Sequence, residues 1–134
     1  MHYAQFVQKV REYAELETPE DADKVIRSTL ETMSERMPRT HREHLAAQLP
    51  QEMKSYLPGK LHMEYFSLED FYQRVGNRSD VSYHRAVKYA LAVVQVLQEA
   101  VAPGELGDIL SAFPEEYNEL FGRRPSGPLS PSSV

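Results

Sequence analysis

Apolar residues recur every three or four positions along most of this chain, which is the spacing of one face of an α-helix. In the first segment of this kind, from about His2 to Glu15, the apolar positions are Tyr3, Phe6, Val7, Val10, Tyr13 and Ala14. Asn-Gly and Asp-Gly turns between alternating apolar and polar residues, which indicate hairpins, are absent from the sequence. The pattern therefore predicts an all-α fold of about eight helices with no sheet.

Capping residues and prolines predict where the next helices begin and end. Thr18 precedes a proline and two acids, which is typical of a helix N-terminus. This second helix runs to about Met37, because Pro38 lacks the N–H that the helix would need and clashes with the preceding turn. A capping-box spacing predicts a third helix over Thr40–Leu49 with Thr40 as its N-cap. A short fourth helix over Gln51–Leu57 follows.

The same order of signals begins again after residue 58. Residues Phe6–Val10 match Phe71–Val75, the cap Thr18 corresponds to Ser82, and from there the offset stays at 64 residues. We interpret this as a tandem duplication of a four-helix unit, with repeat 1 over about residues 3–57, a connector over 58–66 and repeat 2 over about 67–121. Because a unit of about 50 residues is marginal alone, we expect both to share one core in a single domain, 1–121.

Two prolines at equivalent positions, Pro50 and Pro114, each follow an apolar residue. A proline in the first turn of a helix forces the residue before it out of helical geometry. We therefore expect Leu49 and Phe113 to be buried at hinges between the third and fourth helix of each unit. Gly, Pro and Ser make up 9 of the last 13 residues, so we expect 122–134 to be a disordered tail.

The sixth helix, over about Tyr83–Val101, has an unusually wide apolar face. At 100° per residue its apolar positions span roughly 220°, against roughly 140° in the second helix, to which it corresponds. Val87 and Leu91 form the additional strip. Either this helix runs through the centre of the molecule, or the strip is a contact surface for a partner or a second copy. We take the central position as the first interpretation, since large exposed apolar patches are unusual on monomers.

Composition and charge restrict the possible functions. The 134 residues include 15 Lys and Arg against 20 Asp and Glu, a net charge of −5, and no cysteine. Disulfides, thiolate catalysis and cysteine-bound metals are therefore excluded, and the acidic balance argues against nucleic acid as a partner. The sequence has neither a signal-like N-terminus nor an uncharged stretch of roughly 20 residues, so we expect a cytoplasmic protein without a membrane partner.

Several short motifs resemble a bacterial family catalogued as domain of unknown function 2267. They are the Phe-x-x-x-Val openings at Phe6 and Phe71, the string Ala46–Pro50 and the ending Phe113–Phe121. Together they cover essentially residues 1–121, and their order and spacing make the match fairly specific. The resemblance implies an all-helical duplicated fold, and it brings no activity, cofactor or catalytic residue to transfer.

Two histidines on the predicted third helix form the sharpest local candidate for a metal site. His41 and His44 lie three residues apart, so their rings project from adjacent turns and could share a divalent ion. A site also needs a third ligand, and the sequence does not assign Glu43, His62 or His84 to that place. The alternative is that both histidines lie on a solvated helix face. We predict no metal site.

Two acid pairs could in principle supply the carboxylates of a glycosidase. Glu20-Asp21 and Glu115-Glu116 both lie in the first turn of a predicted helix, where carboxylates stabilise the helix dipole by typically 0.3–1 kcal/mol. Serine nucleophile elbows and glycine-rich phosphate loops are missing from the sequence. We therefore predict neither catalytic residues nor a bound cofactor.

Basic residues concentrate in one part of the first half. Arg36, Arg39 and Arg42 lie close in sequence, with Lys54 and Lys60 further along. They could bind a phosphate or nucleic acid, but no recognition motif accompanies them. The alternative is that arginines near a helix end complement its dipole.

We conclude from the sequence alone that this is a small cytoplasmic, non-catalytic helical interaction or scaffold protein. Its partner is expected to be another protein, and a homodimer is one form this could take. The alternative is a carrier that holds a small apolar ligand between the two helical repeats, since such cavities are often lined by helices.

Overall fold

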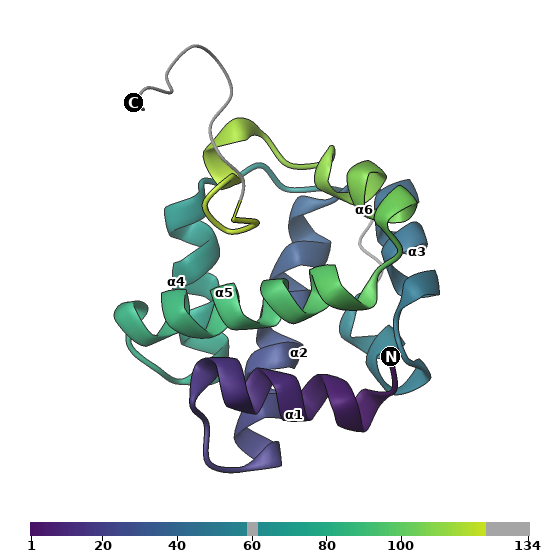
Figure 1. Cartoon of the computed structure of the whole chain (residues 1–134). Helices are drawn as coiled ribbons and strands as arrows, with labels where there is room; N and C mark the ends of the chain where they lie inside the picture. Colours follow the sequence, from purple (N-terminus) through teal and green to yellow (C-terminus); the bar gives the residue numbers. More distant parts are fainter. Residues whose placement is uncertain (59–61, 123–134) are drawn as a thin grey trace, which may run out of the picture.

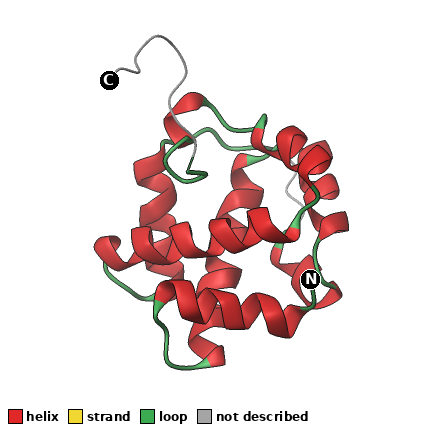
Figure 2. Cartoon of the chain, in the orientation of Figure 1, coloured by secondary structure: helices red, strands yellow, loops and turns green. Residues whose placement is uncertain are grey.

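The computed structural model describes residues 1–58 and 62–122. In these ranges the chain forms six α-helices, two 3-10 helices and no strand, which confirms the predicted all-α fold (Figure 2). The elements are α1 (Tyr3–Ala14), α2 (Pro19–Arg36), α3 (Arg39–Gln48), η1 (Gln51–Tyr56), α4 (Leu68–Ser79), α5 (Tyr83–Ala100), α6 (Pro103–Leu110) and η2 (Glu115–Tyr117). The predicted tail, apart from Gly122, lies outside the described residues.

Hydroxyl caps begin three of the helices as the sequence indicates. The side chains of Thr18, Ser67 and Ser82 each accept a hydrogen bond from the backbone N–H three residues on, at 3.0, 3.1 and 3.2 Å. The predicted cap at Thr40 is wrong, because α3 begins at Arg39 and its N-cap is Pro38. The extended backbone of Pro38, with φ −63° and ψ 155°, already suits an N-cap, where no N–H is needed.

The two halves of the chain correspond in order and in the lengths of their main helices. Helices α1 and α4 have 12 residues each, and both end at a non-glycine residue in the left-handed region, Glu15 with φ 57° and Asp80 with φ 58°. Helices α2 and α5 have 18 residues each. The fourth and eighth predicted helices are short 3-10 segments. Descent from a duplicated unit stays an interpretation of this correspondence.

The packing places α2 and α5 at the centre. Each of α1 and α4 packs on both central helices, so the first helix of each half contacts the second helix of the other (Figure 1). Helices α3 and α6 pack on each other beside this group. Buried side chains from both halves form one cluster, in which Leu49 and Phe113 are each 5% exposed. Burial of these two hinge residues is thus confirmed.

A buried ion-pair cluster joins α2 to α4. Glu35, on α2, receives hydrogen bonds from Arg74 at 3.0 Å and from Arg78 at 2.5 Å. Burial raises the pKa of Glu35, but the hydrogen bonds and charges of the two guanidinium groups outweigh this effect and hold that pKa below its ordinary value. The connector covers the cluster, since Glu64 donates its N–H to the carbonyl of Glu35 at 2.8 Å and Arg74 lies 3.8 Å from the ring centroid of Phe66.

Candidate functional site

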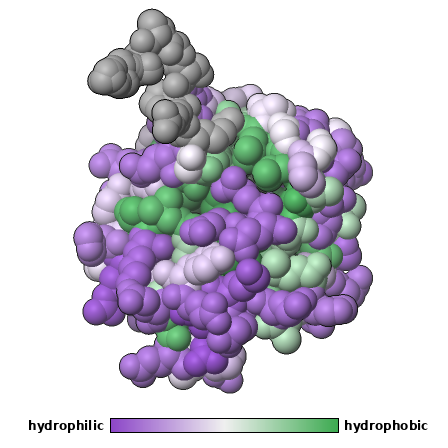
Figure 3. All heavy atoms as spheres, viewed as in Figure 1, coloured by the Kyte–Doolittle hydropathy of each residue, from purple (hydrophilic) through white to green (hydrophobic). Residues whose placement is uncertain are grey.

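An open apolar groove runs along α5, and we call it the α5 groove. It consists of two adjoining cavities of about 390 and 450 Å³ that share Leu91 and Gln95. Its floor is the outer face of α5 from Tyr83 to Glu99, one wall includes Tyr13 of α1, and the other is the segment 119–122. Hydrophobic surface is visible on this face of the molecule (Figure 3).

The amino-acid pattern of α5 explains why the groove is apolar. Most of its alanines and valines, such as Ala90 and Val93, face inward and are buried. Contacts with α1, α2 and α4 show that α5 packs against both halves, but the expectation that a central position would cover its whole apolar arc is wrong. This packing does not cover the additional strip, because Val87 and Leu91 remain only partly buried and line the groove. Tyr83 is 44% exposed at the start of the helix.

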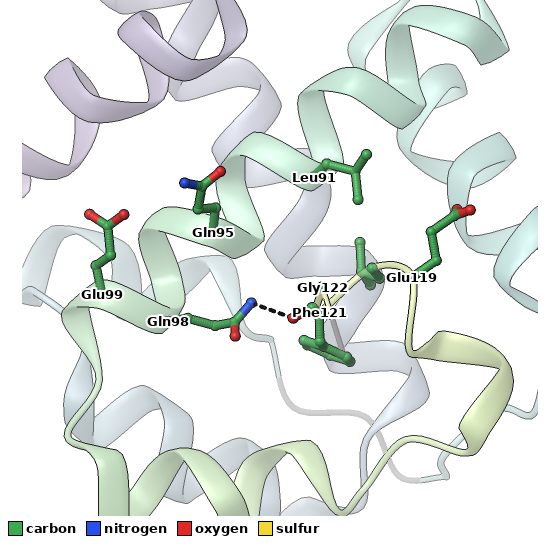
Figure 4. Close-up of a pocket in the computed structure, with 8 residues that line it drawn as sticks. Leu91, Gln95, Gln98, Glu99, Glu119, Phe121 and Gly122 are labelled. Atoms are coloured by element: carbon green, nitrogen blue, oxygen red, sulfur yellow. Dashed lines mark hydrogen bonds between the residues drawn. The ribbon is translucent and has the colours of Figure 1, made fainter. Parts of the chain in front are cut away.

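Internal hydrogen bonds fix the side chains around the groove. Gln98 donates to the carbonyl of Phe121 at 3.2 Å and thereby holds the segment 119–122 against α5 (Figure 4). Glu99 accepts a hydrogen bond from the Tyr13 hydroxyl at 2.8 Å and pairs with Lys9 at 3.0 Å. The Tyr13 hydrogen bond, followed by that of Lys9, lowers the pKa of Glu99 and keeps it ionised.

Charged side chains line both ends of the groove and have partners within the chain. His84 and Lys88 line the end near the start of α5, and Lys88 pairs with Glu15 at 2.5 Å. Glu99 and Glu119 line the other end. Glu119 accepts a hydrogen bond from the Tyr72 hydroxyl at 2.7 Å, and burial, followed by this bond, raises the pKa of Tyr72. The charged side chains at both ends are therefore engaged within the chain, and the partly buried Val87 and Leu91 lie between them.

The structure brings His41 and His44 together with an acid on α6. The Nδ1 atom of His44 lies 2.8 Å from one carboxylate oxygen of Asp108, and Nε2 of His41 lies 3.9 Å from the other. The hydrogen bond that His44 donates to Asp108 raises the pKa of His44, and the same bond lowers the pKa of Asp108. Across residues 1–58 and 62–122 no three His, Asp or Glu side chains are arranged to hold a metal ion. The arrangement is a bridge between α3 and α6.

The remaining candidates for a third ligand lie elsewhere. Glu43 pairs with Arg39 at 3.0 Å on the exposed face of α3. His62, in the connector, and His84, at the groove, are both exposed. Asp108 is the residue that sequence reasoning missed, although it lies 64 positions after His44 and the repeat offset could have indicated it.

The basic cluster predicted from the sequence does not form a common surface. Arg36 and Arg42 are each 5% exposed. Arg36 donates to the carbonyl of Phe66 at 3.2 Å, and Arg42 donates to that of Met37 at 2.8 Å. Lys54 donates to a backbone carbonyl of α3 at 2.5 Å. These side chains bind carbonyl groups near helix ends and in the connector, and Lys60 lies outside the described residues.

The two acid pairs have separate structural environments. Glu20 and Asp21 lie in the first turn of α2, as expected. Glu115 and Glu116 begin η2, which has only three residues, and Glu116 accepts a hydrogen bond from the N–H of Leu68 at 3.4 Å. Both acids thus lie in the first turn of a short helix as expected, and Glu116 also contacts the start of α4.

The fold and this face define a small helical protein with a preformed surface groove. The family model described as "Uncharacterized conserved protein (DUF2267)" matches residues 3–120. The chain therefore belongs to the DUF2267 family. No curated protein matches the chain. Within the described ranges, no helix is both long and apolar enough to cross a bilayer.

Proposed function

We propose that this protein is a non-catalytic interaction or scaffold protein of the cytoplasm that binds another protein chain in the α5 groove. The observation that carries the proposal is that Val87 and Leu91 remain partly exposed in an open apolar groove. Internal hydrogen bonds hold charged side chains such as Glu99 and Glu119 in place at its edge. Such fixed side chains reduce the entropy lost on binding, and apolar surface supplies the driving force.

Packing between the halves favours this role over the alternative of an apolar-ligand carrier. The facing positions of α2 and α5 carry side chains such as Leu30, Met33 and Val93, which are 0% exposed and belong to one cluster. The α5 groove, in contrast, is open along a helix of 18 residues. Such an elongated shape suits a helix or an extended chain better than a compact small molecule.

Site-specific photo-crosslinking tests the proposed function. A benzophenone amino acid would replace Gln95 in the groove or, as a control, Gln73, an exposed glutamine on α4. In cells of the native host we expect a discrete crosslinked protein band from position 95 alone, and we expect Leu91→Glu to abolish it. The same bands from both positions, or none from position 95, would overturn the proposal.

A further inference from the structure

A polar cavity of about 250 Å³ lies between the two halves of the chain. Its lining comes from the turn between α1 and α2, the turn between α4 and α5, and the helices on either side of the second turn and after the first. It shares no lining residue with the α5 groove. We propose that this cavity binds a small zwitterion, namely a free α-amino acid with an apolar side chain. The inference goes beyond the proposed docking function and is independent of it.

Two cations and two acids line the cavity. Asp21 and Lys24 lie near the start of α2, Arg85 lies in the first turn of α5, and Asp80 is the C-cap of α4. Within residues 1–58 and 62–122, none of these four side chains forms a hydrogen bond or an ion pair. The charged side chains of the α5 groove are, in contrast, paired within the chain. The charges of this cavity are therefore available to a ligand.

A buried hydroxyl in the same lining has no hydrogen-bond partner. Ser79 is 2% exposed, and its Oγ atom bonds to none of the described residues. Buried hydroxyls are normally hydrogen-bonded, because burial without a partner destabilises the fold. The equivalent residue at the end of α1 is Ala14, which also precedes a left-handed C-cap and is 1% exposed. Packing at this position therefore does not require a hydroxyl, and Ser79 supplies a polar group that a ligand in the cavity can bond.

The mixture of signs selects the class of ligand. A simple anion would be attracted by Lys24 and Arg85 but would also face Asp21 and Asp80, and a simple cation would meet the reverse. A zwitterion presents a carboxylate to the two cations and an ammonium group to the two acids, and such charge-assisted hydrogen bonds are the strong ones. The lining therefore fits a molecule that carries both charges.

The size and the remaining lining of the cavity indicate an amino acid. Drug-sized ligands occupy pockets of roughly 300–1,000 Å³, so a cavity of about 250 Å³ suits a smaller molecule. The remaining lining is apolar or aromatic and consists of Leu16, Val25, Val81 and Tyr89. An apolar side chain of the ligand can pack against these residues while its head group meets the charges. Free leucine and phenylalanine combine both properties.

Isothermal titration calorimetry of the full chain with leucine and with phenylalanine tests the inference. We expect saturable binding of one molecule per chain. Two analogues test the need for both charges: N-acetyl-leucine lacks the ammonium charge, and leucinamide lacks the carboxylate. Each should bind about tenfold or more weakly than leucine, because each leaves one pair of charged side chains without a partner.

Charge-removing variants assign the two ends of the ligand. Asp80→Asn should weaken leucine binding by about fivefold or more and change the binding of N-acetyl-leucine little, because asparagine also adopts the left-handed backbone of this position. Arg85→Gln should weaken leucine binding to a similar extent and change the binding of leucinamide little. Circular dichroism establishes that both variants are folded.

Two serine variants separate a ligand contact from a structural role. Ser79→Ala should weaken leucine binding severalfold, yet leave the melting temperature of the unliganded chain unchanged or higher, because no internal hydrogen bond is lost. The matched control is Ser34→Ala, since the buried Ser34 hydroxyl donates to the carbonyl of Glu31 at 2.7 Å. This control should lower the melting temperature and leave the affinity for leucine unchanged.

Three results would overturn the inference. The first is the absence of saturable heat with either amino acid up to about 10 mM, which is weaker than specific binding of a small ligand requires. The second is equal affinity for leucine and for both of its analogues, and the third is leucine binding that Asp80→Asn, Arg85→Gln and Ser79→Ala all leave unchanged. The crosslinking experiment in the α5 groove reports separately on the proposed function, because the two sites share no lining residue.

Discussion

Two glutamates at equivalent positions, Glu35 on α2 and Glu99 on α5, anchor the same kind of contact in opposite environments. Arg74 and Arg78 of α4 bind Glu35, and Lys9 and Tyr13 of α1 occupy the corresponding places around Glu99. The Arg74 and Lys9 contacts are both 3.0 Å long. The Glu35 side chain is only 6% exposed, whereas that of Glu99 is 34% exposed.

The connector explains this difference in exposure. Glu64 and Phe66 lie over the Glu35 cluster, through a backbone hydrogen bond and a ring contact with Arg74. The Glu99 cluster instead borders the open α5 groove. The same kind of charged contact is therefore buried in the first half and exposed beside a surface groove in the second. The reason is that the connector lies over the Glu35 cluster and not over the Glu99 cluster.

The largest expected effect concerns the two hinge residues. It tests whether their equal burial makes them equally important for the stability of the fold. Leu49 and Phe113 are both 5% exposed at corresponding hinges. Phe113→Ala should reduce the free energy of unfolding by about 3–5 kcal/mol, and Leu49→Ala by about 2–5 kcal/mol. Urea denaturation followed by circular dichroism measures both. A cost under about 1 kcal/mol at either position would show that the hinges do not support the core equally.

The second prediction concerns the two glutamates themselves. Glu35→Gln should reduce the free energy of unfolding by about 2–4 kcal/mol, somewhat less than for a fully buried pair because both arginine side chains are 32% exposed. Glu99→Gln is its matched control and should cost less than about 1 kcal/mol, as for surface ion pairs. Equal losses in the two variants, measured by the same urea titration, would contradict the assigned difference in burial.

Acid titration sharpens the same comparison. The pKa of Glu35 is lower in the folded chain than the ordinary value of about 4.3, so its ionised form stabilises the fold above that value. This contribution is lost as the pH falls through the lowered, folded-state pKa. The stability difference between wild type and Glu35→Gln should therefore shrink at acidic pH, as measured by thermal melts at a series of pH values. A difference that is constant down to the acid transition would count against an ionised Glu35.

The smallest effect belongs to the exposed bridge between α3 and α6. Because the pKa of His44 is raised, its contribution is fully present below about pH 6.5 and is lost as the pH rises through the folded-state value. Because the pKa of Asp108 is lowered, its contribution is present above about pH 3.9 and is lost as the pH falls through its folded-state value. Asp108→Asn should therefore lower the melting temperature slightly at pH 5–6, with little change above pH 8. A uniform change over this range would contradict the titration of His44.

The local pattern predicted most of the helices, because caps, prolines and apolar spacing act within a few residues. The hydroxyl of Thr18 and the burial of Phe113 are examples. The start of α3 was mispredicted because Pro38 itself provides the N-cap. The predicted tail stays a prediction, since its residues beyond Gly122 lie outside the described ranges.

Contacts between distant segments were not predictable from spacing alone. The arc of apolar positions on α2 suggested one buried face, yet its polar residues Thr32 and Glu35 are also buried, because α4 and the connector cover them. The same reasoning identified the apolar strip on α5 and left open whether it would be covered. Which arginine pairs with which acid depends on how the two halves pack together, and spacing along the sequence does not determine this packing.

The exchange of partners between the halves also has a consequence for how the molecule folds. Helix α1 packs on α5 and helix α4 packs on α2, so neither half has a complete set of neighbours until the whole chain is assembled. Such contacts between distant parts of the sequence slow folding and make it cooperative. Amide protons of α1 and α4 should thus exchange with solvent at the rate of the central helices, through global opening of the molecule.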